Sequence, residues 1–362
     1  MTLPGQMDEV LALTKAGRLA DATALVQQAL LGGRGDDARP ARDATTSDPF
    51  GNRAPLLAFS GPGAEQASAK ADERPGPAAS FTPQVYQGSE GRIAYRLFVP
   101  QGLSGLVPLV IMLHGCTQSP EDFARGTRMN EVAGELGFIV AYPEQTNAAN
   151  PQKCWNWFRP GDQERGRGEP ALIAALTRQI AGAHPVDRER VYAAGLSAGG
   201  AAASIMAAAY PDIYAAVGIH SGLACGSAKD VPSAFAAMNG AGTRQSARSS
   251  DAYVPTITFH GDRDRTVHPS NSEAILATGM ANPKLASFER RTIEGKSPGG
   301  RAFRRTISAD GSGRNWIEHW EIAGGGHAWS GGDAGGSYTD PAGPDASRAM
   351  MAFFLQHRLA EK

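Results

Sequence analysis

Continuous apolar runs alternate with amphipathic segments from about residue 81 to the end of the chain. Because β-branched and aliphatic residues fill these runs, they predict buried parallel strands. The runs cover residues 107–115, 137–144, 190–197, 215–222 and 254–262, and 316–329 ends the series. Apolar positions at helical spacing predict helices over 171–184, 199–210 and 345–358. Alternating strands and helices predict an α/β fold, with a mostly parallel central sheet and helices on both faces.

The segment 92–100 has a different pattern. Its sequence, RIAYRLFVP, alternates apolar and polar residues. Such alternation is typical of a strand with one face on the core and one face toward water. We therefore expect an antiparallel edge strand there.

The first 80 residues differ from the rest. Residues 5–31 contain two short apolar periodicities separated by Gly17, which predict a helical hairpin. One such pair cannot bury its own apolar face, so we expect it to pack on the main domain or on a sister subunit. Self-association or contact with a granule through this hairpin stays open. Residues 32–80 contain too little apolar surface to offset their ordering entropy. The predicted organisation is a hairpin (1–31), a flexible linker (32–80) and an α/β domain (81–362).

Composition excludes several classes of function. The 362 residues include 35 Lys and Arg and 36 Asp and Glu, giving a net charge of −1. This balance gives no reason to expect binding to nucleic acid or to anionic lipid. No apolar run approaches the roughly 18 residues that a membrane helix requires. Lys15 and Arg18 interrupt the apolar positions near the start, so no secretory signal is predicted. A cytoplasmic location is expected, unless a signal was trimmed or export follows another route.

The strongest chemical signal is the sequence Gly195-Leu196-Ser197-Ala198-Gly199. It matches G-x-S-x-G, follows a predicted strand and opens a predicted helix, which is the context of a nucleophile elbow. Flanking glycines remove side chains that would collide in so sharp a turn. The alternative is an ordinary Gly-Ser turn. The sequence predicts Ser197 as a nucleophile beside the positive end of a helix.

A serine nucleophile needs a base, and the base needs an orienting acid. In chain order the acid precedes the histidine in this kind of site. Asp264 follows the strand at 254–262, and His327 follows the last strand in a glycine loop. Both lie at strand ends, where sites of open α/β sheets form. Asp262 competes for the role of acid, and its alternative is a turn residue that binds nearby backbone.

The second oxyanion donor should come from the loop after an early strand. The segment 113–118, LHGCTQ, fits this position, so the backbone N–H groups of Cys116 and Ala198 are the predicted donors. His114 is expected to hold this loop at the substrate site rather than to act as a second base. No zinc, paired-cysteine or phosphate-loop motif is found, so no metal or other cofactor is predicted.

Six motifs together resemble the poly(3-hydroxybutyrate) depolymerase family of esterases, which is related to feruloyl and acetylxylan esterases. The similarity covers residues 81–362. The motifs are MLHGCTQ (112–118), YPEQ (142–145), KCWNWF (153–158), GLSAGG (195–200), FHGDRDRTVHPSN (259–271) and GGGHAWSGG (324–332). The resemblance implies an α/β-hydrolase fold and a triad of Ser197, Asp264 and His327.

The resemblance also implies roles for residues around the triad. It implies that Cys116 and Cys154 are close, either as a disulfide or as a reduced pair, and Cys225 is the third cysteine. Trp155, Trp157 and Trp329 resemble aromatic residues that line the acyl site, and core packing is the alternative for each.

The predicted function is hydrolysis of carboxylic esters through an acyl-enzyme. The substrate is expected to be a small-molecule ester, an oligomer or an amorphous polyester of the 3-hydroxybutyrate type. Aryl or acetyl esters of plant polysaccharide are the alternative. An alternative of another class is a binding module that is tethered through residues 1–80 and has secondary or lost catalysis. Peptidase or acyltransferase chemistry on the same triad also stays open. The resemblance keeps an extracellular or periplasmic location open.

Overall fold

The computed structural model of the protein describes residues 79–242, 253–280, 282, 285 and 287–359. The predicted helical hairpin and the predicted linker up to residue 78 lie outside these residues. Within the described ranges, no helix is both long enough and apolar enough to cross a membrane.

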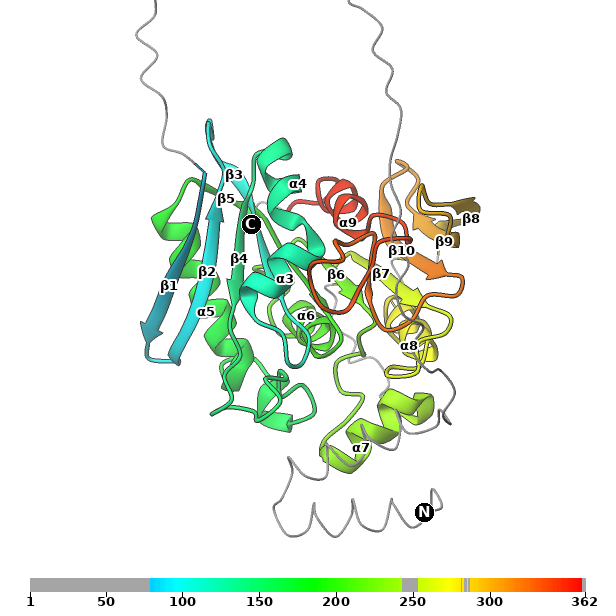
Figure 1. Cartoon of the computed structure of the whole chain (residues 1–362), viewed down its shortest axis with the longest axis horizontal. Helices are drawn as coiled ribbons and strands as arrows, with labels where there is room; N and C mark the ends of the chain where they lie inside the picture. Colours follow the sequence, from blue (N-terminus) through cyan, green and yellow to red (C-terminus); the bar gives the residue numbers. More distant parts are fainter. Residues whose placement is uncertain (1–78, 243–252, 281, 283–284, 286, 360–362) are drawn as a thin grey trace, which may run out of the picture. The chain divides into compact units, whose positions relative to one another are not determined.

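In the described part of the chain, ten strands form one sheet in the order β1-β2-β4-β3-β5-β6-β7-β10-β9-β8 (Figure 1). The strands are β1 (Ser80–Gly88), β2 (Gly91–Val99), β3 (Val107–Leu113), β4 (Ile139–Pro143), β5 (Val186–Leu196), β6 (Ala216–His220), β7 (Thr256–Gly261), β8 (Glu289–Lys296), β9 (Ala302–Ala309) and β10 (Asn315–Ile322). The six central strands from β4 to β10 are parallel. A separate short pair joins β11 (Trp329–Ser330) to β12 (Thr339–Asp340).

Helices cover both faces of the sheet (Figure 1). They are α3 (Pro120–Thr127), α4 (Met129–Leu136), η1 (Pro160–Asp162), α5 (Gly168–Ala183), α6 (Ala198–Ala209), α7 (Val231–Ala236), η2 (Ala237–Ala241), α8 (Ser270–Met280) and α9 (Ala346–Phe354). Strand β3 shows why both faces need cover, since Leu109 and Ile111 pack with α5 and α6. The intervening Val110 and Met112 pack with α3, α4 and α9. A strand buried on both sides requires the continuous apolar run seen in the sequence.

The mostly parallel α/β architecture is therefore confirmed, but one strand prediction is wrong. Strand β2 is antiparallel, as expected, yet it is not an edge strand, because β1 pairs with it along its whole length. The antiparallel hairpin of β8 and β9 extends the other side of the sheet and was not predicted. Strand β8 is almost entirely exposed and β9 is partly buried, and both carry charges on both faces, so no apolar pattern reveals them.

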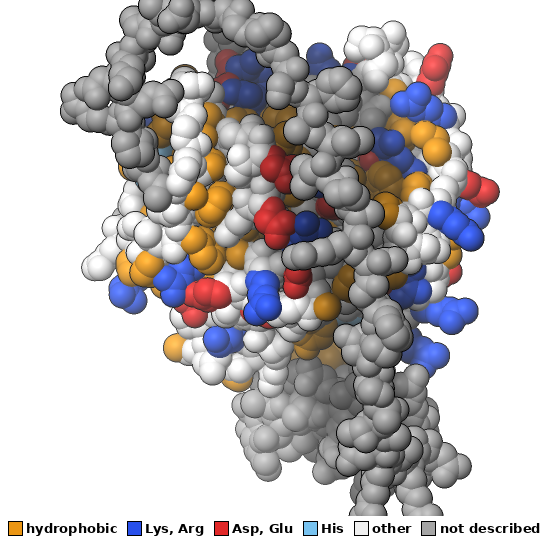
Figure 2. All heavy atoms as spheres, turned by 45° about the horizontal axis from the view of Figure 1, so that its top comes forward, with side chains coloured by type: hydrophobic (Ala, Val, Ile, Leu, Met, Phe, Trp, Pro, Cys, Tyr) orange, Lys and Arg blue, Asp and Glu red, His pale blue; other side chains and the backbone are white. Residues whose placement is uncertain are grey.

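The edge at β8 is charged. Figure 2 shows Lys and Arg side chains along the right-hand flank of the molecule, where Figure 1 places β8 and β9. Some of these charges are paired, since Arg305 contacts Glu318 and Arg304 contacts Glu321. Charged side chains on an exposed edge strand disfavour pairing with strands of other molecules.

A close contact between β6 and α9 tests this packing. A methyl group on Gly218 would lie 2.6 Å from the Sδ atom of Met350 and 3.1 Å from Cζ of Phe354. We expect Gly218→Ala to lower the free energy of unfolding by about 1–3 kcal/mol in denaturant melts, because the fully buried side chains of Met350 and Phe354 must shift to admit the extra carbon. Gly134→Ala is the matched control, since open space surrounds Gly134 in α4, and it should raise stability by about 0.5–1 kcal/mol. Equal effects of the two variants would contradict the packing described.

Candidate active site

Ser197 lies in the sharp turn between β5 and α6. Its φ of 57° and ψ of −119° place it in a backbone region that few residues other than glycine adopt. The turn is fixed from two sides. The Ser197 N–H donates to the carbonyl oxygen of His220 at 2.9 Å, and a side chain on Gly195 or Gly199 would overlap the backbone at Leu113. Glycine is therefore required at both ends of the G-x-S-x-G motif, because the turn passes too close to the end of β3 for a side chain to fit.

His327 and Asp264 meet above the ends of neighbouring strands. The Nδ1 atom of His327, in the loop after β10, lies 2.7 Å from Oδ2 of Asp264, in the loop after β7. The other carboxylate oxygen, Oδ1, accepts the N–H groups of Thr266 and Val267, each at 2.9 Å. These bonds fix the carboxylate and leave Nε2 of His327 to face a reacting group.

The surroundings of Asp264 keep it ionised. Its side chain is fully buried, and burial alone raises the pKa of a carboxyl. The hydrogen bond from His327, together with His260, whose Nε2 lies 3.4 Å from Oδ2, outweighs burial and holds the pKa of Asp264 well below its usual range. A buried, ionised carboxylate stabilises positive charge on His327 as that histidine takes up a proton.

Asp262, the alternative acid, has a different partner. Its Oδ1 accepts the N–H of Gly324 at 2.6 Å, and its own N–H donates to Ile322 O. It therefore holds the glycine loop that carries His327, while Asp264 contacts the imidazole itself.

The loop after β3 lies directly beside Ser197. A Cβ on Gly115 would be 3.7 Å from Cβ of Ser197. Gln118 shapes the loop, since its Oε1 accepts the Gly115 N–H at 2.9 Å and its Nε2 donates to Asp122 at 3.0 Å. Among the described residues, no protein acceptor binds the N–H groups of Cys116 and Ala198, so both are available to a substrate oxygen.

The same loop is tied to the segment that precedes α5. A disulfide joins Cys116 and Cys154. The Thr117 N–H donates to Gln152 O at 2.7 Å, and the indole N–H of Trp155 donates to His114 O at 3.1 Å. A covalent bond and two hydrogen bonds thus fix the position of the Cys116 N–H.

Three of the four residues named for the substrate site, His114, Trp155 and Trp329, are buried. His114 is 1% exposed, and its ring nitrogens lie 2.7 Å from Gly115 O and 3.1 Å from the Gln145 N–H. Burial lowers the pKa of His114 to about 4. Trp155 is also 1% exposed, as is Trp329, whose indole binds Ser347 and whose ring stacks on His220. Their polar groups are used inside the protein, which favours loop support for His114 and core packing for Trp155 and Trp329.

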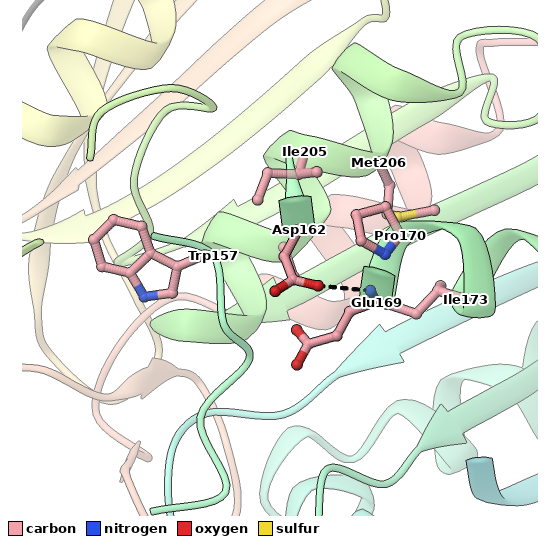
Figure 3. A pocket seen from close by; sticks show the side chains of 8 residues that line it. Trp157, Asp162, Glu169, Pro170, Ile173, Ile205 and Met206 are labelled. Atoms are coloured by element: carbon pink, nitrogen blue, oxygen red, sulfur yellow. Dashed lines mark hydrogen bonds between the residues drawn. The ribbon is translucent and has the colours of Figure 1, made fainter. Parts of the chain in front are cut away.

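Trp157, the fourth, does line a pocket. Figure 3 shows its ring on one side, with Asp162 and Glu169 opposite. Apolar side chains complete the wall, namely Pro170, Ile173, Ala202, Ile205 and Met206. Most of its lining residues come from α5 and α6, and the expected contact of Trp157 with substrate stays a prediction.

Glu169 is a residue that sequence analysis missed. Its carboxylate accepts the Asn156 N–H at 2.8 Å and the Gln145 Nε2–H at 2.6 Å, and its own N–H donates to Asp162 (Figure 3). Burial raises the pKa of Glu169 to about 7, with a further contribution from Asp162 and opposition from the hydrogen bonds of Asn156 and Gln145. Glu169 therefore anchors the segment that contains Asn156. An acidic residue in the first turn of a helix is common, so the sequence does not reveal this role.

Within the described ranges, no cluster of three or more His, Cys, Asp and Glu side chains is arranged to hold a metal ion. The chemistry available at this point of the sheet is that of a hydroxyl, an imidazole, a carboxylate and backbone N–H groups.

The sequence of this chain is similar to those of known proteins. The model of the family "Esterase PHB depolymerase" matches residues 93–296, which include Ser197 and Asp264. Poly(3-hydroxyalkanoate) depolymerase C of Paucimonas lemoignei is 34% identical over 189 residues, 49% of this chain and 45% of the relative. Feruloyl esterase B of Thermothelomyces thermophilus is 34% identical over 139 residues, 38% of this chain and 47% of the relative. The matches span about half the length of these relatives.

A solved structure extends the similarity to the fold. The acetyl xylan esterase from Aspergillus awamori superposes with a TM-score of 0.60 at 18% identity, covering 76% of this chain and 99% of that one. At this identity the comparison shows the fold alone. The expected α/β-hydrolase fold is confirmed.

Glu169 generates a prediction about pH. The carboxyl releases its proton near pH 4.5 in the unfolded chain and near pH 7 in the folded one, so the unfolded chain binds fewer protons in between. The contribution of Glu169 to stability is therefore present at low pH and is lost as the pH rises from 4.5 to 7. Relative to Glu169→Gln, the wild type should lose ~2 to 3 kcal/mol of unfolding free energy across this window.

Denaturant melts at several pH values test this prediction. Glu164→Gln is the matched control, because Glu164 pairs with Arg167 at the surface, and it should follow the wild-type curve. Parallel curves for the wild type and Glu169→Gln would contradict the account of this carboxyl.

Proposed function

The chain belongs to the esterase PHB depolymerase family, and from this premise we propose that it is a serine esterase that hydrolyses carboxylic esters through an acyl-enzyme. The hydrogen bond between His327 and the buried carboxylate of Asp264, at the sheet edge where Ser197 is held in its sharp turn, carries the proposal. This combination supplies a nucleophile, a base and an orienting acid.

In the first half of the reaction, Ser197 Oγ attacks the ester carbonyl while His327 Nε2 takes up its proton. Asp264 accepts the Nδ1–H bond, which holds the imidazole in the tautomer whose Nε2 is basic. Negative charge develops on the carbonyl oxygen, and the N–H groups of Cys116 and Ala198 stabilise it by donating hydrogen bonds to that oxygen. Collapse of this intermediate breaks the bond to the alcohol, which leaves with the proton from His327.

In the second half, water replaces the alcohol. His327 removes a proton from water, the resulting hydroxide attacks the acyl carbonyl, and Ser197 leaves with the proton returned by His327. The same two N–H groups stabilise the second oxyanion. The products are a carboxylic acid and the free enzyme.

For the substrate, we propose esters of the 3-hydroxybutyrate type, as oligomers or amorphous polymer. The family description and the similarity to poly(3-hydroxyalkanoate) depolymerase C support this choice. Aryl and acetyl esters are the second candidate, supported by the similarity to feruloyl esterase B and to acetylxylan esterases. Contact with a polymer granule through residues 5–31 stays a prediction.

The location of the protein is also a proposal. A disulfide between Cys116 and Cys154 favours an oxidising compartment. Because the disulfide secures the loop with the oxyanion donor, we favour a compartment that maintains it, outside the cytoplasm.

Triad variants test the mechanism. Ser197→Ala should lower kcat toward a short-chain aryl ester by about four orders of magnitude or more, since no other hydroxyl replaces the nucleophile. Asp264→Asn should lower kcat by about four orders of magnitude, because an amide favours the wrong tautomer of His327. Asp262→Asn is the matched control and should cost less than about tenfold, since its partner is backbone. Full turnover by Ser197→Ala, or equal losses at Asp262 and Asp264, would refute the assignment.

A comparison of substrates tests the proposed specificity. We expect kcat/KM to be higher for hydroxybutyrate oligomers than for methyl ferulate or acetylated xylan under the same conditions. A preference for methyl ferulate or acetylated xylan would contradict the proposed substrate and favour aryl or acetyl esters. It would not contradict the proposed mechanism.

A further inference from the structure

Tyr338 is an exposed aromatic residue beside the histidine of the site. Its side chain is 47% exposed, and its ring centroid lies 6.5 Å from that of His327, with the two planes at 77°. Its hydroxyl lies 3.4 Å from Oγ1 of Thr117. Thr117 Oγ1 itself donates to Cys116 O, so the Tyr338 hydroxyl is the donor in this contact. The ring thus lies between the base and the loop with the oxyanion donor.

The backbone of Tyr338 is held from both sides. Its carbonyl oxygen accepts the Trp329 N–H at 2.7 Å, just after His327 in the chain. The preceding residue, Ser337, donates its N–H to Asp122 at 2.9 Å, and its carbonyl accepts Gln118 Nε2–H at 3.1 Å. Gln118 also binds the Gly115 N–H, so one amide side chain fixes the oxyanion loop and the tyrosine segment together. The loop that carries Tyr338 accordingly lies beside α3 (Figure 1).

The conformation of Tyr338 is unfavourable for its residue type. Its φ is 51°, in the left-handed region that an aromatic side chain rarely adopts. Strained positions of this kind persist only where surrounding bonds impose them, and they concentrate at ligand sites. Burial of the ring does not compensate for this strain, because the Tyr338 side chain is exposed. The Trp329 side chain, by contrast, is 1% exposed. The backbone bonds of Ser337 and Tyr338, and not burial of the ring, therefore hold the ring beside His327.

We propose that Tyr338 contacts the substrate and determines specificity, its ring forming an aromatic wall for the alcohol-side group of the ester. This inference rests on the proposed esterase function. His327 delivers a proton to the leaving alcohol oxygen, so a ring beside His327 faces the substituent on that oxygen. An aromatic wall selects a flat or extended group, such as a benzyl group or a further hydroxyacyl unit, over a short alkyl group.

Two acetate esters with alcohols of different shape test the proposal. In Tyr338→Ala, kcat/KM for benzyl acetate should fall roughly 3- to 10-fold through a higher KM, because the ring contact is lost. For ethyl acetate kcat/KM should change less than about twofold, because a short alkyl group reaches little of the ring. Tyr338→Phe should retain the preference for benzyl acetate, because the ring carries it. Leu355→Ala is the matched control, as it truncates an exposed apolar side chain at the end of α9.

Binding without turnover separates this inference from the proposed function. In the Ser197→Ala background, benzyl acetate should bind roughly 3- to 10-fold more weakly when Tyr338 is also replaced by Ala, as measured by ligand-observed NMR titration. Equal losses for both esters in the kinetic assay, or unchanged binding of benzyl acetate, would overturn the role of Tyr338. Absence of turnover in the wild type together with weakened binding in the double variant would overturn the esterase function and leave the contact standing.

Discussion

The close crossing of the β5–α6 turn over the end of β3 is the constraint on which the site depends. At Gly195 and Gly199 the backbone of this turn approaches the backbone of Leu113 so closely that no side chain fits between them. The crossing forces Ser197 into its positive φ and places it against Gly115. The close approach of the turn to Leu113 therefore determines both how Ser197 is presented and how near it lies to the oxyanion loop.

Two acidic residues near the site show how environment assigns different protonation behaviour to the same group. Asp264 is buried but receives hydrogen bonds from His327 and from two backbone N–H groups and lies 3.4 Å from His260, so its pKa is depressed. Glu169 is buried beside a second carboxyl, Asp162, and its pKa rises to about 7. The first residue keeps a charge that orients His327. The second anchors the segment whose Cys154 is bonded to Cys116.

Much of the fold could be predicted because the central strands are buried on both faces. Strand β3, for example, is apolar at every position and is buried along its whole length. The outer strand β8, with the sequence ERRTIEGK, is exposed and charged and gives no such pattern. The triad residues are recognisable from local motifs. Gln118, Glu169 and Tyr338 are not, because their roles arise from contacts between distant segments, such as Gln118 with Ser337. Indole rings such as Trp329 serve equally well in a core or a binding site, so only packing separates the two.

The central claim is that Ser197 forms a covalent acyl-enzyme with an ester substrate. The most direct measurement is acid quenching of the enzyme during turnover of an activated acetate ester, followed by peptide mapping with mass spectrometry. The account predicts an acetyl group on the peptide that contains Ser197, on that hydroxyl, which decays as product forms. An acetyl group that accumulates on another residue, or turnover without any acylated peptide under conditions where deacylation is slowed, would contradict it.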